Sequence, residues 1–189
     1  MIKTFLAATW LAAAATTAFA DDLPNPASGY LCCNMRTDGS WISDSNYMEN
    51  GKRVIPAGTP MKVTGYGRQR VIVEIEGKEM KIGNDYSRDL NLPTFARRYL
   101  VTEDPRKKIA TYPPAIRKAI EHAQVMPGMT REQVLMAVGP PISSETPNLD
   151  GKVWRFWIGS FSEFQVVFEN DVVKQIDTDP QTRNLVVAD

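Results

Sequence analysis

Histidine and cysteine are scarce in this chain of 189 residues, which has one histidine and two adjacent cysteines. Catalytic triads and metal sites draw mainly on these residue types, so we expect neither an enzyme nor a bound cofactor or metal. An excess of one charge is also lacking, because 22 Lys and Arg balance 22 Asp and Glu. Nucleic-acid binders usually carry a basic excess, so nucleic acid is not an expected partner.

Long hydrophobic runs are missing after the first twenty residues, so the sequence predicts no spanning helix, which takes about 20 apolar residues. Residues 1–20 have the three parts of a secretory signal peptide: Lys3, an apolar stretch over 5–15, and Ala18-Phe19-Ala20 before Asp21. Cys32 lies too far from that stretch to be a lipoprotein cysteine. We therefore predict a periplasmic protein, either free or associated with the outer membrane.

The adjacent Cys32 and Cys33 are expected to remain thiols. Neighbouring Cα atoms are about 3.8 Å apart, below the usual disulfide range of about 4.4–6.8 Å. In a strand, the two side chains would also point to opposite faces. We expect one buried and one half-exposed thiol; the alternatives are an intermolecular disulfide and a soft-metal site that includes Met35.

Five or six short strands separated by turns are predicted over residues 28–90. Apolar and polar residues alternate in 71–76, and Pro56-Ala57-Gly58-Thr59-Pro60 leads into the strand 61–64. This turn and the hairpin after it resemble bacterial SH3-like domains. The resemblance implies a small SH3-like β-barrel in this half of the chain.

A basic linker is expected over residues 91–113, between prolines that break regular structure. From Arg97 to Lys118 the sequence has seven basic and two acidic residues, whereas residues 142–189 have an acidic excess. Such a segment fits a solvated linker, or a contact with an anionic membrane surface or an acidic partner.

The C-terminal half has strong helix signals. Apolar residues at 116, 119, 120 and 123 lie on one helical face. Thr130 and Gln133 form a capping box that begins a second helix, Arg131–Val138. Gly139 supplies its C-cap and Pro140 prevents continuation.

Three antiparallel strands are predicted after these helices. Trp154, Phe156 and Ile158 share one face of the first strand, and Phe164, Val166 and Phe168 alternate in the second. Asn170-Asp171 makes the turn into the third strand. Two helices that cover a three-stranded sheet give an α+β fold.

The motifs Val125-Met126-Pro127-Gly128-Met129-Thr130, Val138-Gly139-Pro140-Pro141 and Val166-Val167-Phe168 resemble the SmpA/OmlA domain of the BamE-like family. The resemblance covers residues 114–178 and implies an outer-membrane barrel-assembly factor with two helices packed on a three-stranded sheet. Unlike the family's lipoproteins, this chain has no cysteine at the predicted mature N-terminus. The same unit resembles β-lactamase inhibitor proteins, whose aromatic sheet face binds another protein.

The candidate partner-binding residues lie on or beside the first of these strands. Trp157 alternates with Trp154 and Phe156, so it lies on the other face of the strand. If that face is open, Trp157 binds a partner together with Phe161 and Arg155; the alternative is burial of Trp157 against the N-terminal barrel. We interpret Gly128, Thr130, Gly139, Pro140 and Trp154 as structural residues.

These observations predict a non-enzymatic envelope assembly or interaction factor that binds another protein. The alternatives are a peptidoglycan-binding module that uses the SH3-like domain, and an envelope inhibitor or immunity-type protein.

Overall fold

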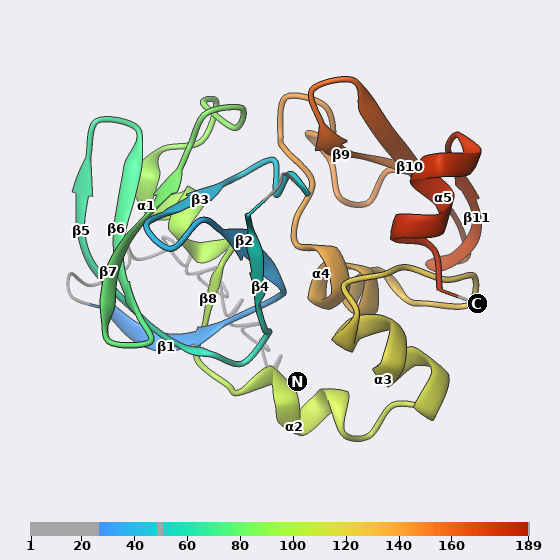
Figure 1. Cartoon of the computed structure of the whole chain (residues 1–189), viewed down its shortest axis with the longest axis horizontal. Coiled ribbons are helices and arrows are strands. Elements are labelled where there is room, and N and C mark those ends of the chain that lie inside the picture. Colours follow the sequence, from blue (N-terminus) through green and yellow to red (C-terminus); the bar gives the residue numbers. More distant parts are fainter. Residues whose placement is uncertain (1–26, 49–50, 189) are drawn as a thin grey trace, which may run out of the picture.

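The computed structural model describes residues 27–48 and 51–188, so the predicted signal peptide lies outside the described residues. Most of the first half forms one curled sheet, on the left of Figure 1, with the strand order β4-β2-β3-β7-β6-β5-β1-β8. Its strands are β1 (Ala27–Leu31), β2 (Met35–Thr37), β3 (Trp41–Ser43), β4 (Arg53–Ile55), β5 (Pro60–Gly67), β6 (Arg70–Ile75), β7 (Lys78–Gly83) and β8 (Leu100–Val101).

The curled sheet encloses a hydrophobic core because apolar residues alternate along its longer strands. In β5, Met61 and Val63 are buried between exposed residues, and in β6 Val71 and Val73 are buried between residues that are partly or fully exposed. β5, β6 and β7 form an antiparallel meander, whereas β3 pairs with β7 in parallel. Through this pairing β3, with β2 and β4 beyond it, extends the sheet past β7.

Residues 91–113 are not a linker, and that prediction is wrong. They form α1 (Leu92–Arg97), β8 and α2 (Pro105–Ile109). Phe95 and Tyr99 are fully buried in the first core with their rings edge to face, and β8 pairs with β1. Because basic side chains dominate the composition of this segment, the few apolar residues that bury it in the core could not be recognised from the sequence.

The second half has three more helices and a separate three-stranded sheet, on the right of Figure 1. Trp154, Phe156 and Phe168 form the centre of its core. The ring centroid of Phe168 lies 4.7 Å from that of Trp154, and the centroid of Phe156 lies 6.4 Å from it. The elements are α3 (Pro114–Glu121), α4 (Arg131–Val138), β9 (Val153–Gly159), β10 (Ser162–Glu169), β11 (Val172–Asp177) and α5 (Pro180–Val186).

The predicted architecture, a small barrel followed by two helices layered on a three-stranded sheet, is wrong. The structure is mostly β, with an eight-stranded curled sheet, a three-stranded sheet and five short helices in the described residues. β8 extends the first sheet beyond a five- or six-stranded barrel. In the second half, α5 buries Val186 in the core, and α3 and α4 also bond to the first sheet.

Most of the predicted local signals of the C-terminal half are confirmed, but α3 ends at Glu121, so Ala123, with φ +54°, lies beyond the helix on whose face we predicted it. α4 spans the predicted residues, and Thr130 and Gln133 form the capping box. Gly139 ends α4 at φ +79°, and Pro140 and Trp154 are buried. Gly128 has φ +90° in the turn before α4. These residues therefore have structural roles.

Two buried asparagines, Asn34 and Asn46, join the two halves. The Asn34 amide nitrogen donates to the carbonyls of Ile120 at 2.5 Å and Ala137 at 3.0 Å, and its oxygen accepts from the Ala57 amide at 2.9 Å. Asn46 donates to the Val138 carbonyl at 2.9 Å. The last carbonyls of α3 and α4 thus find their partners in the first half.

Candidate functional site

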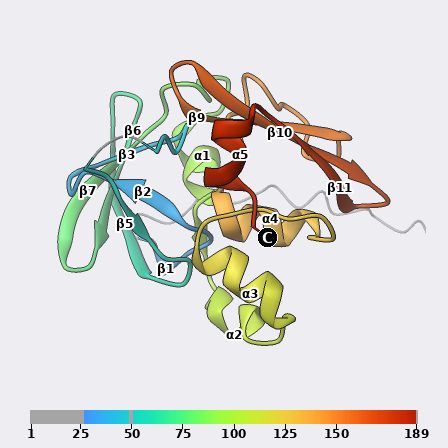
Figure 2. The same ribbon diagram turned by 45° about the vertical axis from the view of Figure 1, so that its right-hand side comes forward.

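The outer face of the three-stranded sheet carries the residues that we predicted to bind a partner. Trp157 pairs with Glu163 across β9 and β10, and Arg155 pairs with Gln165. Both predicted residues are half-buried, on the face opposite Trp154. Figure 2 shows the sheet from the side, with α3 and α4 beneath it. The structure therefore places Arg155 and Trp157 together on the outer face.

Phe161 lies at the tip of the β9–β10 hairpin and is the most exposed large hydrophobic residue described. Its relative exposure is 99%, whereas Tyr86, Val153, Val172 and Leu185 range from 37% to 49%. A phenylalanine ring in water forgoes about 1.5–3 kcal/mol of hydrophobic stabilisation. Its position contributes nothing to the described core, so the prediction that Phe161 is open to a partner is consistent with the structure.

Arg155 is held by two carboxylates on this face. Its guanidinium lies 3.1 Å from Glu145 and 3.4 Å from Glu163. Asp177 lies on the same face because it pairs with Gln165, which pairs with Arg155. With three carboxylates and one guanidinium, the surface around Trp157 is acidic.

The Trp157 side chain is only partly accessible to a partner, because it is half-buried. It lines a small cavity of about 20 Å³ with Arg36 and Met48, and the Met48 amide donates to the Ile158 carbonyl at 2.8 Å. The loop before β4 thus covers the edge of β9. Burial lowers the pKa of the Arg36 guanidinium, because little water reaches its charge. Trp157 therefore contributes to the junction of the halves as well as to the open face.

Cys32 and Cys33 form a disulfide, so the prediction of two thiols is wrong. Both residues lie in a bend between β1 and β2, not in a strand. In a bend, adjacent side chains need not point to opposite faces as they do in a strand. The predicted difference in burial is confirmed: Cys33 is fully buried and Cys32 is half-buried.

A cleft of about 710 Å³, here called the disulfide cleft, lies beside Cys32. Leu135 and Met136 of α4 give it an apolar wall, and a Lys108–Glu132 ion pair closes part of the rim. The contact with Glu132 raises the pKa of the Lys108 ammonium. The other lining residues are Arg98, Val101, Glu103, Asp104, Pro105, Lys107, Pro140 and Leu149.

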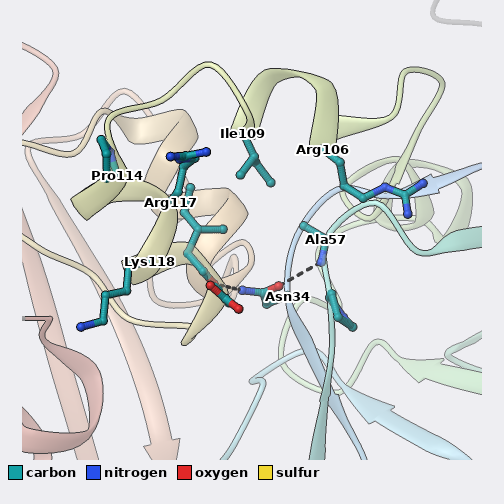
Figure 3. A pocket seen from close by; sticks show the side chains of 10 residues that line it. Asn34, Ala57, Arg106, Ile109, Pro114, Arg117 and Lys118 are labelled. Atoms are coloured by element: carbon teal, nitrogen blue, oxygen red, sulfur yellow. Dashed lines mark hydrogen bonds between the residues drawn. The ribbon is translucent and has the colours of Figure 1, made fainter.

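A shallower hollow of about 460 Å³ lies above Asn34 and opens between α2 and α3 (Figure 3). Arg106, Arg117 and Lys118 line it, and Glu121 is its carboxylate. Arg106 is bound to Asp104 of the same helix at 2.6 Å. Three of the seven basic residues between Arg97 and Lys118 thus line this hollow, whereas Arg98, Lys107 and Lys108 line the disulfide cleft.

A group of aromatic and polar side chains lies where the loop after β7 meets the segment after α4, and sequence reasoning missed it. Tyr86 is 45% exposed, and its ring centroid is 6.4 Å from that of Tyr47. Beside it, a hollow of about 510 Å³ is lined by Asp85, Asp89 and Ser143, among others. The only signal in the sequence was the dense polar run at 84–89.

Among residues 27–48 and 51–188, no cluster of three or more His, Cys, Asp or Glu could hold a metal ion. None of the helices described is both long and apolar enough to cross a membrane. His122 is exposed, and its Nδ1 lies 2.7 Å from the Lys118 carbonyl oxygen.

The comparisons with known proteins found no relative. No family model matches the sequence, and neither a curated protein nor a solved structure is significantly similar to it. The BamE-like and SH3-like resemblances therefore stay predictions, and function has to be argued from the surface itself.

Proposed function

We propose that this protein is a non-enzymatic factor of the cell envelope that binds another protein through the outer face of its C-terminal sheet. The observation that carries the proposal is the exposure of Phe161, which is 99% at the hairpin tip beside Trp157. Interfaces are enriched in aromatic anchors that become buried when the partner binds.

The charges around this surface specify the partner's chemistry. Glu145, Glu163 and Asp177 outnumber Arg155, so a partner that fits would present basic side chains around an apolar pocket that accepts a phenylalanine ring. The periplasm, predicted from residues 1–20, is the compartment in which we expect this partner.

Site-specific crosslinking in intact cells tests the proposal. A photoreactive amino acid placed at Phe161 should give one dominant crosslinked protein. The matched control is the same substitution at Thr64, an exposed β5 position in the other half. A barrel-assembly component captured from position 161 supports an assembly role, whereas a captured enzyme supports the inhibitor or immunity-type alternative. Equal capture from both positions contradicts the proposal.

Peptidoglycan binding is the second candidate function, and the Tyr86 group favours it. Sugar rings stack on exposed aromatic faces, and carboxylates such as Asp85 and Asp89 accept bonds from their hydroxyls. Co-sedimentation with purified peptidoglycan tests this. Tyr86→Ala should abolish retention, and Phe161→Ala should leave it unchanged.

A further inference from the structure

The two sulfurs of the Cys32–Cys33 disulfide differ sharply in accessibility. Cys33 is fully buried in the core of the first half, whereas Cys32 is half-buried and lines the disulfide cleft. Of the two cysteines only Cys32 lines the cleft, so a reagent that enters it meets this residue and not Cys33. This asymmetry separates an attackable sulfur from a protected leaving group.

The surroundings of Cys32 suit a reduced sulfur as well as an oxidised one. Its Sγ lies 3.1 Å from the Arg98 carbonyl oxygen. A disulfide sulfur has no proton, so the contact becomes a hydrogen bond only after reduction, when the Cys32 thiol can donate. The protein thus holds an acceptor that only the dithiol form uses.

The backbone around the disulfide is held independently of the sulfur bond. The Cys32 amide donates to the Tyr99 carbonyl at 2.8 Å, and the Asn34 amide donates to the Met136 carbonyl at 3.0 Å. With the side-chain bonds of Asn34, these contacts fix both ends of the bend. None of these hydrogen bonds involves a sulfur atom.

The disulfide cleft has the chemistry to receive a thiol-bearing peptide. Leu135 and Met136 offer an apolar wall to neighbouring side chains. The cations of the cleft, Arg98, Lys107 and Lys108, are matched in number by the carboxylates Glu103, Asp104 and Glu132, and Lys107 has no ion-pair partner among the described residues. Cations close to a cysteine favour the thiolate, which is the attacking form in thiol–disulfide exchange.

We propose that Cys32–Cys33 is an exchangeable disulfide that oxidises cysteine thiols of polypeptides bound in the cleft. The peptide thiolate attacks Cys32 Sγ and forms a mixed disulfide. The Cys32–Cys33 bond breaks, its electron pair leaves on Cys33 Sγ, and the proton given up by the attacking thiol ends there.

A second peptide thiolate then completes the reaction. It attacks the peptide sulfur of the mixed disulfide, which forms a peptide disulfide and releases Cys32. Two thiols have been oxidised, and the two electrons and two protons are now on Cys32 and Cys33. The Cys32 thiol donates to the Arg98 carbonyl oxygen.

The wild-type protein provides the first test. Incubation of purified, oxidised protein with an excess of a cysteine-containing pentapeptide that has leucine beside the cysteine should yield the peptide disulfide. The folded protein should gain about 2 Da by intact mass, because two hydrogens are added. The proposal is overturned if protein purified under oxidising conditions has two free thiols. It is also overturned if the folded protein stays oxidised in the presence of excess peptide.

Single-cysteine variants test the predicted asymmetry. Cys33→Ser should react with the same peptide carrying a 2-nitro-5-thiobenzoate leaving group and form a one-to-one mixed disulfide. Cys32→Ser, which keeps only the buried thiol, should react at least tenfold more slowly. Circular dichroism confirms that both variants are folded. Equal rates, or a faster Cys32→Ser, contradict the assignment of Cys32.

A cleft variant tests whether the peptide binds before it reacts. In the Cys33→Ser background, Leu135→Ser should slow exchange with the peptide at least threefold and leave exchange with a glutathione derivative unchanged. Leu185→Ser, at an exposed position on α5 outside the cleft, is the matched control and should change neither rate. Glutathione that reacts as fast as the peptide in the parent overturns the role of the cleft in binding polypeptides.

Discussion

The side-chain amide of Asn34 donates a hydrogen bond to the main-chain carbonyl of Ala137, 103 residues further along the chain, at 3.0 Å. The same amide reaches the Ile120 carbonyl, and its oxygen accepts from the Ala57 amide. One buried side chain therefore joins the first half to the ends of α3 and α4. The two halves are coupled through polar contacts, although each has its own hydrophobic core.

Asn34→Ala should destabilise the protein strongly. The substitution leaves the Ile120 and Ala137 carbonyls and the Ala57 amide without this partner, at about 1–3 kcal/mol for each buried group that stays unpaired. We expect a total loss of about 3 kcal/mol in the free energy of unfolding by urea denaturation. Asn148→Ala, at an exposed turn, is the control and should change stability by less than about 1 kcal/mol. If Asn34→Ala unfolds at the same urea concentration as the wild-type protein, this account of the junction is contradicted.

Substitutions at Gly128 and Gly139, the two glycines that flank α4, distinguish the cost of backbone strain from the cost of steric contact. Both have positive φ, which costs an L-residue about 1–2 kcal/mol. An added Cβ at Gly128 meets nothing within 4 Å, whereas at Gly139 it would lie 3.0 Å from Met35 Sδ. Thermal unfolding should therefore show a larger loss for Gly139→Ala than for Gly128→Ala. The reverse order rules out steric contact with Met35 as the cause.

Thr130→Ala should cost about 1 kcal/mol, because the Thr130 hydroxyl accepts from the Gln133 amide at the start of α4. Gln133→Ala removes the reciprocal bond to the Thr130 amide. In a double-mutant cycle, the two losses should be less than additive, since each substitution breaks the same capping box. Strict additivity in urea denaturation would show that the two bonds act independently.

Asp44 should make stability depend on pH. Burial raises its pKa, an effect partly offset by the Tyr86 amide, which donates to it at 2.9 Å. An acid whose folded pKa is raised binds more protons when folded, so its stabilising effect is full below the unfolded value of 3.8 and is lost as pH rises through the folded value. Asp44→Asn should therefore raise the Tm more at pH 7.5 than at pH 4.

Asp38 gives the opposite control for this experiment. The Ser40 and Trp41 amides lower its pKa, so its stabilising effect is present above pH 3.8 and lost as pH falls through the folded value. Asp38→Asn should lower the Tm at pH 7.5 and matter little at low pH. A Tm difference for Asp44→Asn that does not vary with pH contradicts the assignment of Asp44.

Local structure could be predicted from the sequence wherever one residue type fixes one conformation. Thr130, Gln133 and Gly139 gave both ends of α4, and the alternation around Trp154 gave the buried face of β9. The assembly of these elements could not be predicted. β8 has two residues and pairs with β1 about 70 positions earlier, and no local pattern encodes such a pairing.

The candidate site was predictable in part for the same reason. Alternation placed Arg155 and Trp157 opposite Trp154, and Phe161 falls in the hairpin turn. The contact between Trp157 and Met48 depends on how the two halves pack together, and no local sequence pattern predicts that packing. The Cys32–Cys33 bond could not be predicted because its Cα separation of 3.7 Å lies below the usual disulfide range, and because a strand, unlike the observed bend, would direct the two side chains apart.

Trp157→Ala should lower both stability and partner binding. The ring is half-buried beside Arg36 and Met48, so its removal should cost about 2 kcal/mol in unfolding, less than the 3–5 kcal/mol typical of a core tryptophan. Phe161→Ala removes a ring that touches no core and should leave the urea midpoint unchanged. A Trp157→Ala protein as stable as wild type contradicts the contact with the first half.

The most direct test of the proposed interface uses the partner captured from position 161. Its affinity is measured for the wild-type protein, for Phe161→Ala and for Leu185→Ala. By isothermal titration, Phe161→Ala should raise the Kd at least about 30-fold, since an interface anchor contributes about 2 kcal/mol or more. Leu185→Ala removes a residue that is 49% exposed on α5, and it should bind like wild type. If Phe161→Ala keeps the wild-type Kd, the outer face of the C-terminal sheet is not the binding surface.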